Sequence, residues 1–178
     1  MNASHAVVLD GVSSRYPDKP ELAAQERPEE GSGTCVRVVE LDVPAGTCTV
    51  LCGRSGDGKS TVLRLIDGLA GTFFPGERKG VVLIGGTDVL DLEPRQRTEG
   101  MGVVMQDPRS QFFMGTVADE IAFSLENLGT DPSVTVARVR AAAELCGVLE
   151  LLSEKLTELS SGQKQRVALA AAIACRPR

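Results

Sequence analysis

The sequence contains no tryptophan, only one tyrosine and only one histidine. Its five cysteines are odd in number and include no Cys-x-x-Cys pair, so we expect them to be reduced core residues. Cys48 and Cys52 share one face of an expected strand through its two-residue period, which leaves a metal site as the alternative. Because the one histidine, His5, lies far away in the sequence, we expect this pair to bind no metal and His5 to lie on the surface.

Long hydrophobic runs and an excess of basic residues are also missing. No run approaches the roughly 18 residues that cross a bilayer, and residues 1–10 carry no basic leader before an apolar run. The 19 Lys and Arg residues are outnumbered by 24 Asp and Glu residues, which gives a net charge of -5. This balance offers no general electrostatic reason to bind nucleic acid. We therefore expect a cytoplasmic protein that binds no nucleic acid and reaches any membrane through a partner.

The length of the chain and its hydrophobic content limit the size of the core. The sequence has 178 residues, of which 42% are hydrophobic, and this suits one domain with room for a subdomain. Short β-rich runs at residues 6–9 and 36–43 are expected to be strands, with a polar, acidic loop at residues 19–33 between them. The first part of the chain is therefore predicted to be rich in strands.

A glycine-rich turn at residues 53–61 joins an apolar run at residues 47–52, expected to be a strand, to a helix expected from Val62. The turn has the G-x-x-x-x-G-K-S pattern, in the strand-to-helix context that separates a P-loop from a glycine turn with an incidental lysine. Its glycines permit backbone angles that let successive N–H groups form a phosphate cradle. Lys59 is expected to reach the β- and γ-phosphates, and the Ser60 hydroxyl to help hold Mg²⁺.

Strands and then helices are expected after the P-loop. The runs at residues 81–84 and 101–105 are predicted to be strands, the second of a buried type. Gln106 ends this second strand, where it could ligate Mg²⁺ or orient water, or be an ordinary polar residue at a strand end. Residues 107–158 form a helical block whose first helix opens at Thr116, with acidic residues in its first turn. We interpret this block as a subdomain inserted in an α/β core.

The last motif opens a helix. A helix expected at residues 134–146 is closed by Gly147, and the motif LSSGQKQR follows at residues 159–166. The motif runs into a segment rich in alanine and leucine, which favour a helix. Residues 160–162 place hydroxyl groups and free N–H groups at the N-terminus of that helix. This end could bind a second anion, or it could be the cap of a structural helix.

Taken together, Tyr16, the P-loop, Gln106 and the motif at residues 159–166 resemble the ATP-binding cassette (ABC) ATPases in order and spacing across nearly the whole chain. The resemblance implies an α/β P-loop NTPase (RecA-like) core with an N-terminal antiparallel β region and an inserted helical subdomain. It also implies ATP and Mg²⁺ as cofactors and ATP hydrolysis as the activity. Tyr16 would stack on adenine in such a protein, whereas its residue type alone fits a strand-edge aromatic equally well.

The resemblance implies a role for each matching residue. Gln106 corresponds to the Q-loop residue, and the last motif corresponds to the signature that contacts the γ-phosphate bound by the opposite subunit of a cassette dimer. Gln106 is the expected catalytic residue, and Ser60 and Gln106 are the expected Mg²⁺ ligands. The residues expected to contact nucleotide are Tyr16, Gly53, Arg54, Ser55, Gly56, Asp57, Gly58, Lys59, Ser60, Thr61, Ser160, Ser161, Gly162 and Gln163.

Within this superfamily, several stretches look like the energy-coupling factor (ECF) type of vitamin and metal importers. The resemblance implies a second cassette, identical, different or fused, and a transmembrane coupling subunit at the cytoplasmic face of the cell membrane. Phe112 and Phe113 are expected either to dock on that subunit or to lie in the core. The stretches that carry the likeness are residues 106–108, 111–112, 116–123 and 126–129, together with residues 73–77, which are similar to ECF ATPases built as two fused cassettes.

Two departures from the family pattern matter. Ser161 replaces the first of the two glycines in the usual signature. The sequence also stops at Arg178, before the apolar strand ending in Asp-Glu (the Walker B strand) and the switch histidine that come next in the family. We therefore expect an incomplete domain that binds nucleotide weakly at most and does not hydrolyse it alone. Apolar surface and unpaired backbone should be exposed where the missing strand would lie.

The expected organisation is a single incomplete ABC ATPase domain over residues 1–178. A β region and P-loop core occupies residues 1–106, the helical subdomain residues 107–158, and the signature motif with its helix residues 159–178. Two other functions remain as alternatives: a non-catalytic nucleotide-binding module, and a non-transport ABC ATPase that acts on DNA or ribosomes.

Overall fold

The computed structural model describes residues 5–15, 35–70 and 77–177. The chain divides into two compact units, Met1–Glu93 and Pro94–Arg178, here called the N-terminal and C-terminal units. The three segments expected within the domain stay a prediction.

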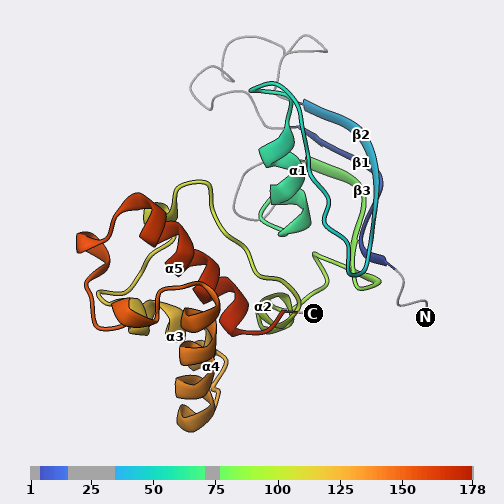
Figure 1. Ribbon diagram of the computed structural model, residues 1–178. Coiled ribbons are helices and arrows are strands. Elements are labelled where there is room, and N and C mark those ends of the chain that lie inside the picture. The colour runs from blue at the N-terminus through green and yellow to red at the C-terminus, as the bar shows by residue number, and fades with distance from the viewer. Residues whose placement is uncertain (1–4, 16–34, 71–76, 178) are drawn as a thin grey trace, which may run out of the picture. The chain divides into compact units, whose positions relative to one another are not determined.

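An antiparallel sheet forms the N-terminal unit, as predicted (Figure 1). Leu9, Val12 and Val82 lie on the buried face, where each is at most 2% exposed. A register shift of the first strand between Leu9 and Val12 lets these two residues, three apart, face the same side. Helix α1 (Lys59–Ile66) lies beside the strands and buries Leu65. The strand order is β2-β1-β3-β4, with β1 at His5–Arg15, β2 at Cys35–Pro44, β3 at Glu77–Ile84 and β4 at Thr87–Asp88.

The hairpin of β3 and β4 is closed by an ion pair between Arg78 and Asp88. The two guanidinium nitrogens donate to the two carboxylate oxygens at 3.0 and 2.7 Å, and both side chains are mostly buried. These hydrogen bonds hold the pKa of Asp88 below its ordinary value, against the opposing effect of burial. Bidentate pairs of this kind are among the stronger polar interactions in proteins.

Stability of the N-terminal unit should depend on this pair and on pH. Because the pKa of Asp88 is lowered in the folded state, its contribution is complete above the ordinary value near 4 and is lost as the pH falls below it. We expect Asp88→Asn to cost about 1–3 kcal/mol at pH 7 and much less at pH 3. Thermal unfolding at both pH values measures this, with the exposed Asp91→Asn as control. A cost that did not change with pH would contradict the prediction.

Two predicted strands do not form. Residues 47–52 and 101–105 pair with no strand within the described ranges. The side chain of Val50 is 74% exposed and that of Val104 43% exposed. Those two predictions were wrong because hydrophobicity marks a run as suited to a buried strand, whereas a strand also needs a neighbour to pair with. The expected exposure of apolar surface beside the P-loop is confirmed for residues 47–52, where Val50 and Leu51 are exposed.

The cysteines differ in burial. The four whose side chains are described are all free, with Cys175 buried, Cys146 half-buried, and Cys48 and Cys52 exposed. The expectation of core residues is therefore wrong for Cys48 and Cys52, because they belong to the run that forms no strand. Burial raises the pKa of the Cys175 and Cys146 thiols, which makes both less reactive.

Three packed helices form the core of the C-terminal unit (Figure 1). The first of them contributes Val117, Ile121 and Leu125 to this core, and the buried sides of the other two helices are rich in alanine. The helices are α3 (Val117–Asn127), α4 (Pro132–Leu145) and α5 (Ser161–Ala174), with the short α2 (Pro94–Gly100) before them and 3₁₀ turns at Pro108–Ser110, Leu149–Leu151 and Leu156–Glu158.

The predicted helix boundaries hold where a capping residue sets them. Thr116 accepts a hydrogen bond from the backbone N–H of Asp119 and begins α3, as expected. Gly147 adopts a left-handed conformation (φ 63°) just after α4, also as expected. Helix α4 begins two residues earlier than predicted, because Asp131 caps it and Pro132 suits the first helical position. Helix α2 was not predicted.

Candidate functional site

The P-loop turns into α1 through two left-handed glycines. Gly56 and Gly58 have φ angles of 93° and 87°, which side chains disfavour. The helix then begins at Lys59, three residues before the start expected from hydrophobicity. The turn therefore has the backbone shape that the sequence predicts, even though the run before it forms no strand.

The first turn of α1 is open to an anion. Gly58 supplies no side-chain cap, and the first backbone bond of the helix runs from the Val62 N–H to the Gly58 carbonyl at 2.9 Å. The N–H groups of the preceding helical residues therefore point out of the helix end. No acidic residue lies in this turn, and Arg64 lies in the last one, so the charges match an anion at the N-terminus.

Lys59 reaches back over the loop. Its ammonium donates to the carbonyl oxygens of Gly53 and Arg54 at 2.9 and 2.6 Å. These bonds hold the charge at the rim of the turn, where a phosphate at the helix end would meet it. A hydrogen bond within the loop also links two of its residues, because the Arg54 N–H donates to the Asp57 carboxylate at 2.5 Å.

The remaining P-loop side chains suit a phosphate with its Mg²⁺. The Ser60 hydroxyl is exposed on the first turn, whereas Thr61 is buried and packs inward. Arg54 and Ser55 are exposed on the loop. A hydroxyl oxygen beside an open helix end is a fitting ligand for the hard Mg²⁺ ion. The residues present therefore fit a nucleoside triphosphate with Mg²⁺.

The motif at the start of α5 forms a capping box. The Ser160 hydroxyl accepts from the Gln163 N–H at 3.3 Å, and the Gln163 side chain accepts from the Ser160 N–H at 2.8 Å. These two side chains satisfy each other as the cap of a structural helix would. Ser161 and Gly162 are exposed, and Gly162 has open space around its Cα. Contact of this end with nucleotide stays a prediction, as does any effect of Ser161.

Gln106 lies at the start of the loop that leads to Pro108–Ser110, with an exposed side chain. It belongs to the C-terminal unit and the P-loop to the N-terminal unit, so its role beside Mg²⁺ stays a prediction. Tyr16 lies outside the described residues. The structure thus assembles the P-loop and the α5 motif, each within its own unit.

Two anchoring residues of the C-terminal unit were missed by the sequence analysis. Glu120 is 5% exposed and accepts from the backbone N–H groups of Phe113 and Met114, both at 2.9 Å. Gln111 bonds two backbone groups of the preceding segment. Glu120 could have been found, because it stands on the apolar face of α3, one residue before the buried Ile121.

The two phenylalanines after Gln106 have different surroundings. Phe112 packs against the helical core, so the core interpretation holds for it. Phe113 is 73% exposed and stacks on Phe123, with 5.3 Å between the ring centroids. Phe113 is therefore the one of the two that is free to meet a partner.

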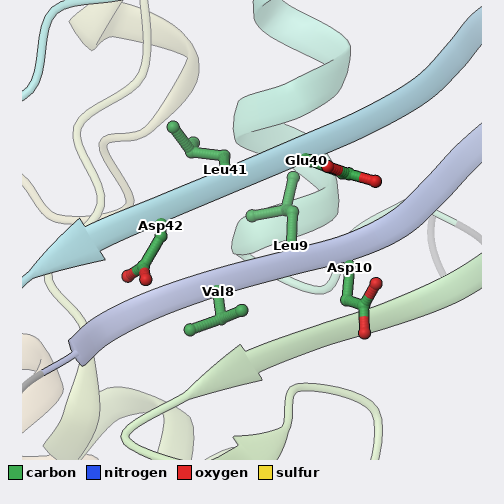
Figure 2. Close-up of a pocket in the computed structure, with 6 residues that line it drawn as sticks. All are labelled: Val8, Leu9, Asp10, Glu40, Leu41 and Asp42. Carbon is green, nitrogen blue, oxygen red and sulfur yellow. The ribbon is translucent and has the colours of Figure 1, made fainter.

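A depression of about 350 Å³ lies on the N-terminal sheet, and no P-loop residue lines it (Figure 2). It is lined by β1 and β2, and its polar side chains are the carboxylates of Asp10, Glu40 and Asp42. Three like charges would repel a nucleotide. His5 bonds Asp42 at 2.5 Å and is on the surface, as expected. We therefore assign no nucleotide site to this depression.

Within residues 5–15, 35–70 and 77–177, no group of three or more His, Cys, Asp or Glu side chains is arranged to hold a metal ion. Over the same ranges, no helix has the length and apolar character needed to cross a membrane.

Comparison with known proteins agrees with the P-loop geometry. The ABC transporter family matches residues 36–178. A putative ABC transporter ATP-binding protein of Streptomyces coelicolor is 41% identical over 142 residues, which are 80% of this chain and 25% of that protein. The energy-coupling factor transporter ATP-binding protein EcfA1 of Streptococcus sanguinis is 39% identical over 139 residues, 78% of this chain and 48% of that protein. The chain thus spans between a quarter and a half of these relatives.

A solved structure has the same fold. The cbiO1 protein of Clostridium perfringens, described as part of the ABC transporter complex cbiONQ, matches with a TM-score of 0.73. The match covers 98% of this chain and 63% of that one at 22% identity, which shows the fold alone. The predicted α/β P-loop fold is confirmed, with only part of an ABC domain present. These matches show that the chain belongs to the ABC transporter family of ATP-binding proteins, and the P-loop with its open helix end is consistent with that family.

Proposed function

We propose that this chain is the ATP-binding part of an ECF-type ABC importer. In such a protein, ATP binding and hydrolysis in a cassette dimer drive uptake of a vitamin, metal ion or similar micronutrient. The observation that carries the proposal is the N-terminus of α1, which has no side-chain cap. Two left-handed glycines precede this helix end, and the Lys59 ammonium bonds back to the loop. The likeness to EcfA1 proteins at 38–39% identity supports the importer type.

Each P-loop group has a part in holding the nucleotide. The N–H groups of residues 58–60 would donate to phosphate oxygens, and Lys59 would exchange its two carbonyl partners for the β- and γ-phosphates. Ser60 and Gln106 would ligate Mg²⁺, which when bound neutralises phosphate charge and favours phosphoryl transfer. The hydrogen bond between Arg54 and Asp57 would keep the loop open while the phosphates enter.

The proposed partners are a second cassette and a membrane subunit. The exposed α5 end at Ser161 and Gly162 would face the nucleotide of the second cassette. Phe113 would dock on a transmembrane coupling subunit at the cytoplasmic face of the cell membrane, because a large exposed aromatic is an effective anchor at an interface. The cbiO1 neighbour, described as part of a transporter complex, is consistent with such an assembly.

Binding of a fluorescent ATP analogue with Mg²⁺ tests the proposal. Lys59→Ala should weaken binding by roughly tenfold or more, because it removes a charge-assisted contact to phosphate. Lys79→Ala is a matched control on the same unit, since Lys79 is an exposed lysine of β3. Equal affinity of Lys59→Ala and the unaltered chain would overturn the proposal.

We expect the 178 residues to bind nucleotide without sustained hydrolysis, which a phosphate-release assay checks.

A further inference from the structure

The loop after residue 105 contains two glutamines in opposite situations. Gln106 has an exposed side chain with no hydrogen-bond partner in the described part of the chain. Gln111 uses both ends of its amide: Oε1 accepts from the Met105 N–H at 2.8 Å, and Nε2 donates to the Val103 carbonyl at 3.2 Å. One glutamine is therefore available to a ligand, and the other is fixed to the backbone.

Gln111 bonds two backbone groups of the segment before Gln106. Residues 101–105 pair with no strand in the described ranges, so their backbone groups lack ladder partners. A side-chain amide carries one acceptor and one donor side by side, as a peptide group does. By bonding Met105 and Val103 together, Gln111 holds the segment immediately before Gln106 in one conformation.

The rest of the loop is fixed by its own hydrogen bonds. The Asp107 carbonyl accepts from both the N–H and the hydroxyl of Ser110, at 3.1 and 2.7 Å. The Gln111 N–H donates to the Pro108 carbonyl at 3.1 Å. With the Gln111 amide closing the loop onto Met105, the backbone on both sides of Gln106 is tied down. The Gln106 side chain itself takes part in none of these bonds.

We propose that Gln111 is the positioning residue for Gln106, and that its amide sets the backbone from which Gln106 reaches the Mg²⁺ of a bound nucleotide. This inference rests on the proposed function. Gln111 itself would touch neither ion nor nucleotide, so it acts only through the loop. A residue that merely stabilised the fold would affect binding with and without Mg²⁺ alike, whereas a positioning residue affects only the Mg²⁺-dependent part.

The test compares Gln111→Met with Gln106→Ala in the full chain. Methionine keeps the length of the side chain and removes both hydrogen bonds. For both variants we expect the Mg²⁺ concentration that half-saturates binding of a fluorescent ATP analogue to rise roughly tenfold, as for other residues that orient a metal ligand. Affinity without Mg²⁺ should not change. Asn127→Leu, which alters an exposed amide on α3, is the control.

A second readout separates the failure of this inference from that of the proposed function. Amide hydrogen exchange at Met105 should become faster in Gln111→Met and stay unchanged in Gln106→Ala. Normal Mg²⁺ dependence of Gln111→Met, or equal weakening with and without Mg²⁺, would overturn the inference while Lys59-dependent binding upheld the proposed function. Unchanged Mg²⁺ dependence in Gln106→Ala would overturn it too. Absence of Lys59-dependent binding in the unaltered chain would overturn both.

Discussion

Replacing Gly80 with alanine should lower the melting temperature of the N-terminal unit by about 12–40 °C. Gly80 lies in β3 with φ at 78°, and a Cβ there would stand 2.5 Å from the carbonyl oxygen of Gly11 and 2.6 Å from that of Asp10. Both oxygens belong to the backbone of β1, at the register shift between Asp10 and Ser13. They can move only if the ladder between β1 and β3 opens. Relieving the clash therefore costs backbone hydrogen bonds.

The expected size follows from two contributions. A left-handed conformation costs alanine about 1–2 kcal/mol, and opening two or three ladder bonds costs about 1 kcal/mol each. A total of roughly 3–5 kcal/mol would lower the melting temperature by about 12–40 °C for a unit of this size. Circular dichroism during heating measures the shift.

Gly46→Ala is the matched control for this prediction. Gly46 has nearly the same φ, 74°, but a Cβ there would meet no atom within 4 Å. It should therefore show only the conformational cost, about 1–2 kcal/mol. Equal melting temperatures for the two variants would mean that the close approach of β1 to Gly80 does not limit the fold.

Local signals in the sequence were enough to predict the elements that depend on local chemistry. Thr116 sets the start of α3 and Gly147 the end of α4, because a cap and a left-handed glycine act within a few residues. The P-loop forms its turn for the same reason, since Gly56 and Gly58 determine its backbone. The capping box of α5 is equally local, and its Ser-x-x-Gln spacing could have been recognised from Ser160 onward.

Features that need a distant partner could not be predicted in the same way. Residues 47–52 and 101–105 have the composition of buried strands, but composition does not say which segment lies beside them. The bond from Gln111 to Met105 likewise arises only once the loop has folded back. The predicted Mg²⁺ ligands Ser60 and Gln106 belong to different units, and no local signal in either stretch bears on that prediction.

Replacing Glu120 with alanine should have the largest effect in the C-terminal unit. Its carboxylate is buried at 5% exposure and receives the N–H groups of Phe113 and Met114, both at 2.9 Å. Hydrogen bonds to a charged group contribute about 1.5–3 kcal/mol each, and removing the acceptor leaves two donors without this partner. Because removal also relieves the cost of burying the carboxylate, the net effect is smaller than the sum of the two bonds. We expect Glu120→Ala to lower the free energy of unfolding by about 2–4 kcal/mol, measured by urea denaturation.

The matched controls for Glu120 lie on the same helix. Glu126 is exposed near the end of α3, so Glu126→Ala should change stability by no more than about 0.5 kcal/mol. Glu120→Gln keeps an acceptor oxygen without the charge and should fall between the two. Equal stability of the Glu120→Ala and Glu126→Ala variants would show that the buried carboxylate is not needed.

Loss of this carboxylate should also release the aromatic that we propose as an anchor. Glu120 holds the backbone of Phe113, whose ring is exposed and stacked on Phe123. Without the carboxylate, the loop would have to be ordered again whenever Phe113 met a partner, and that ordering costs affinity.

Glu120→Ala should therefore weaken binding to a membrane subunit even at temperatures where α3 stays folded. Phe113→Ala should weaken binding without lowering stability as much. Both variants would be compared by pull-down with the subunit and by helical circular dichroism. Normal binding by folded Glu120→Ala would show that docking does not need a fixed Phe113 backbone.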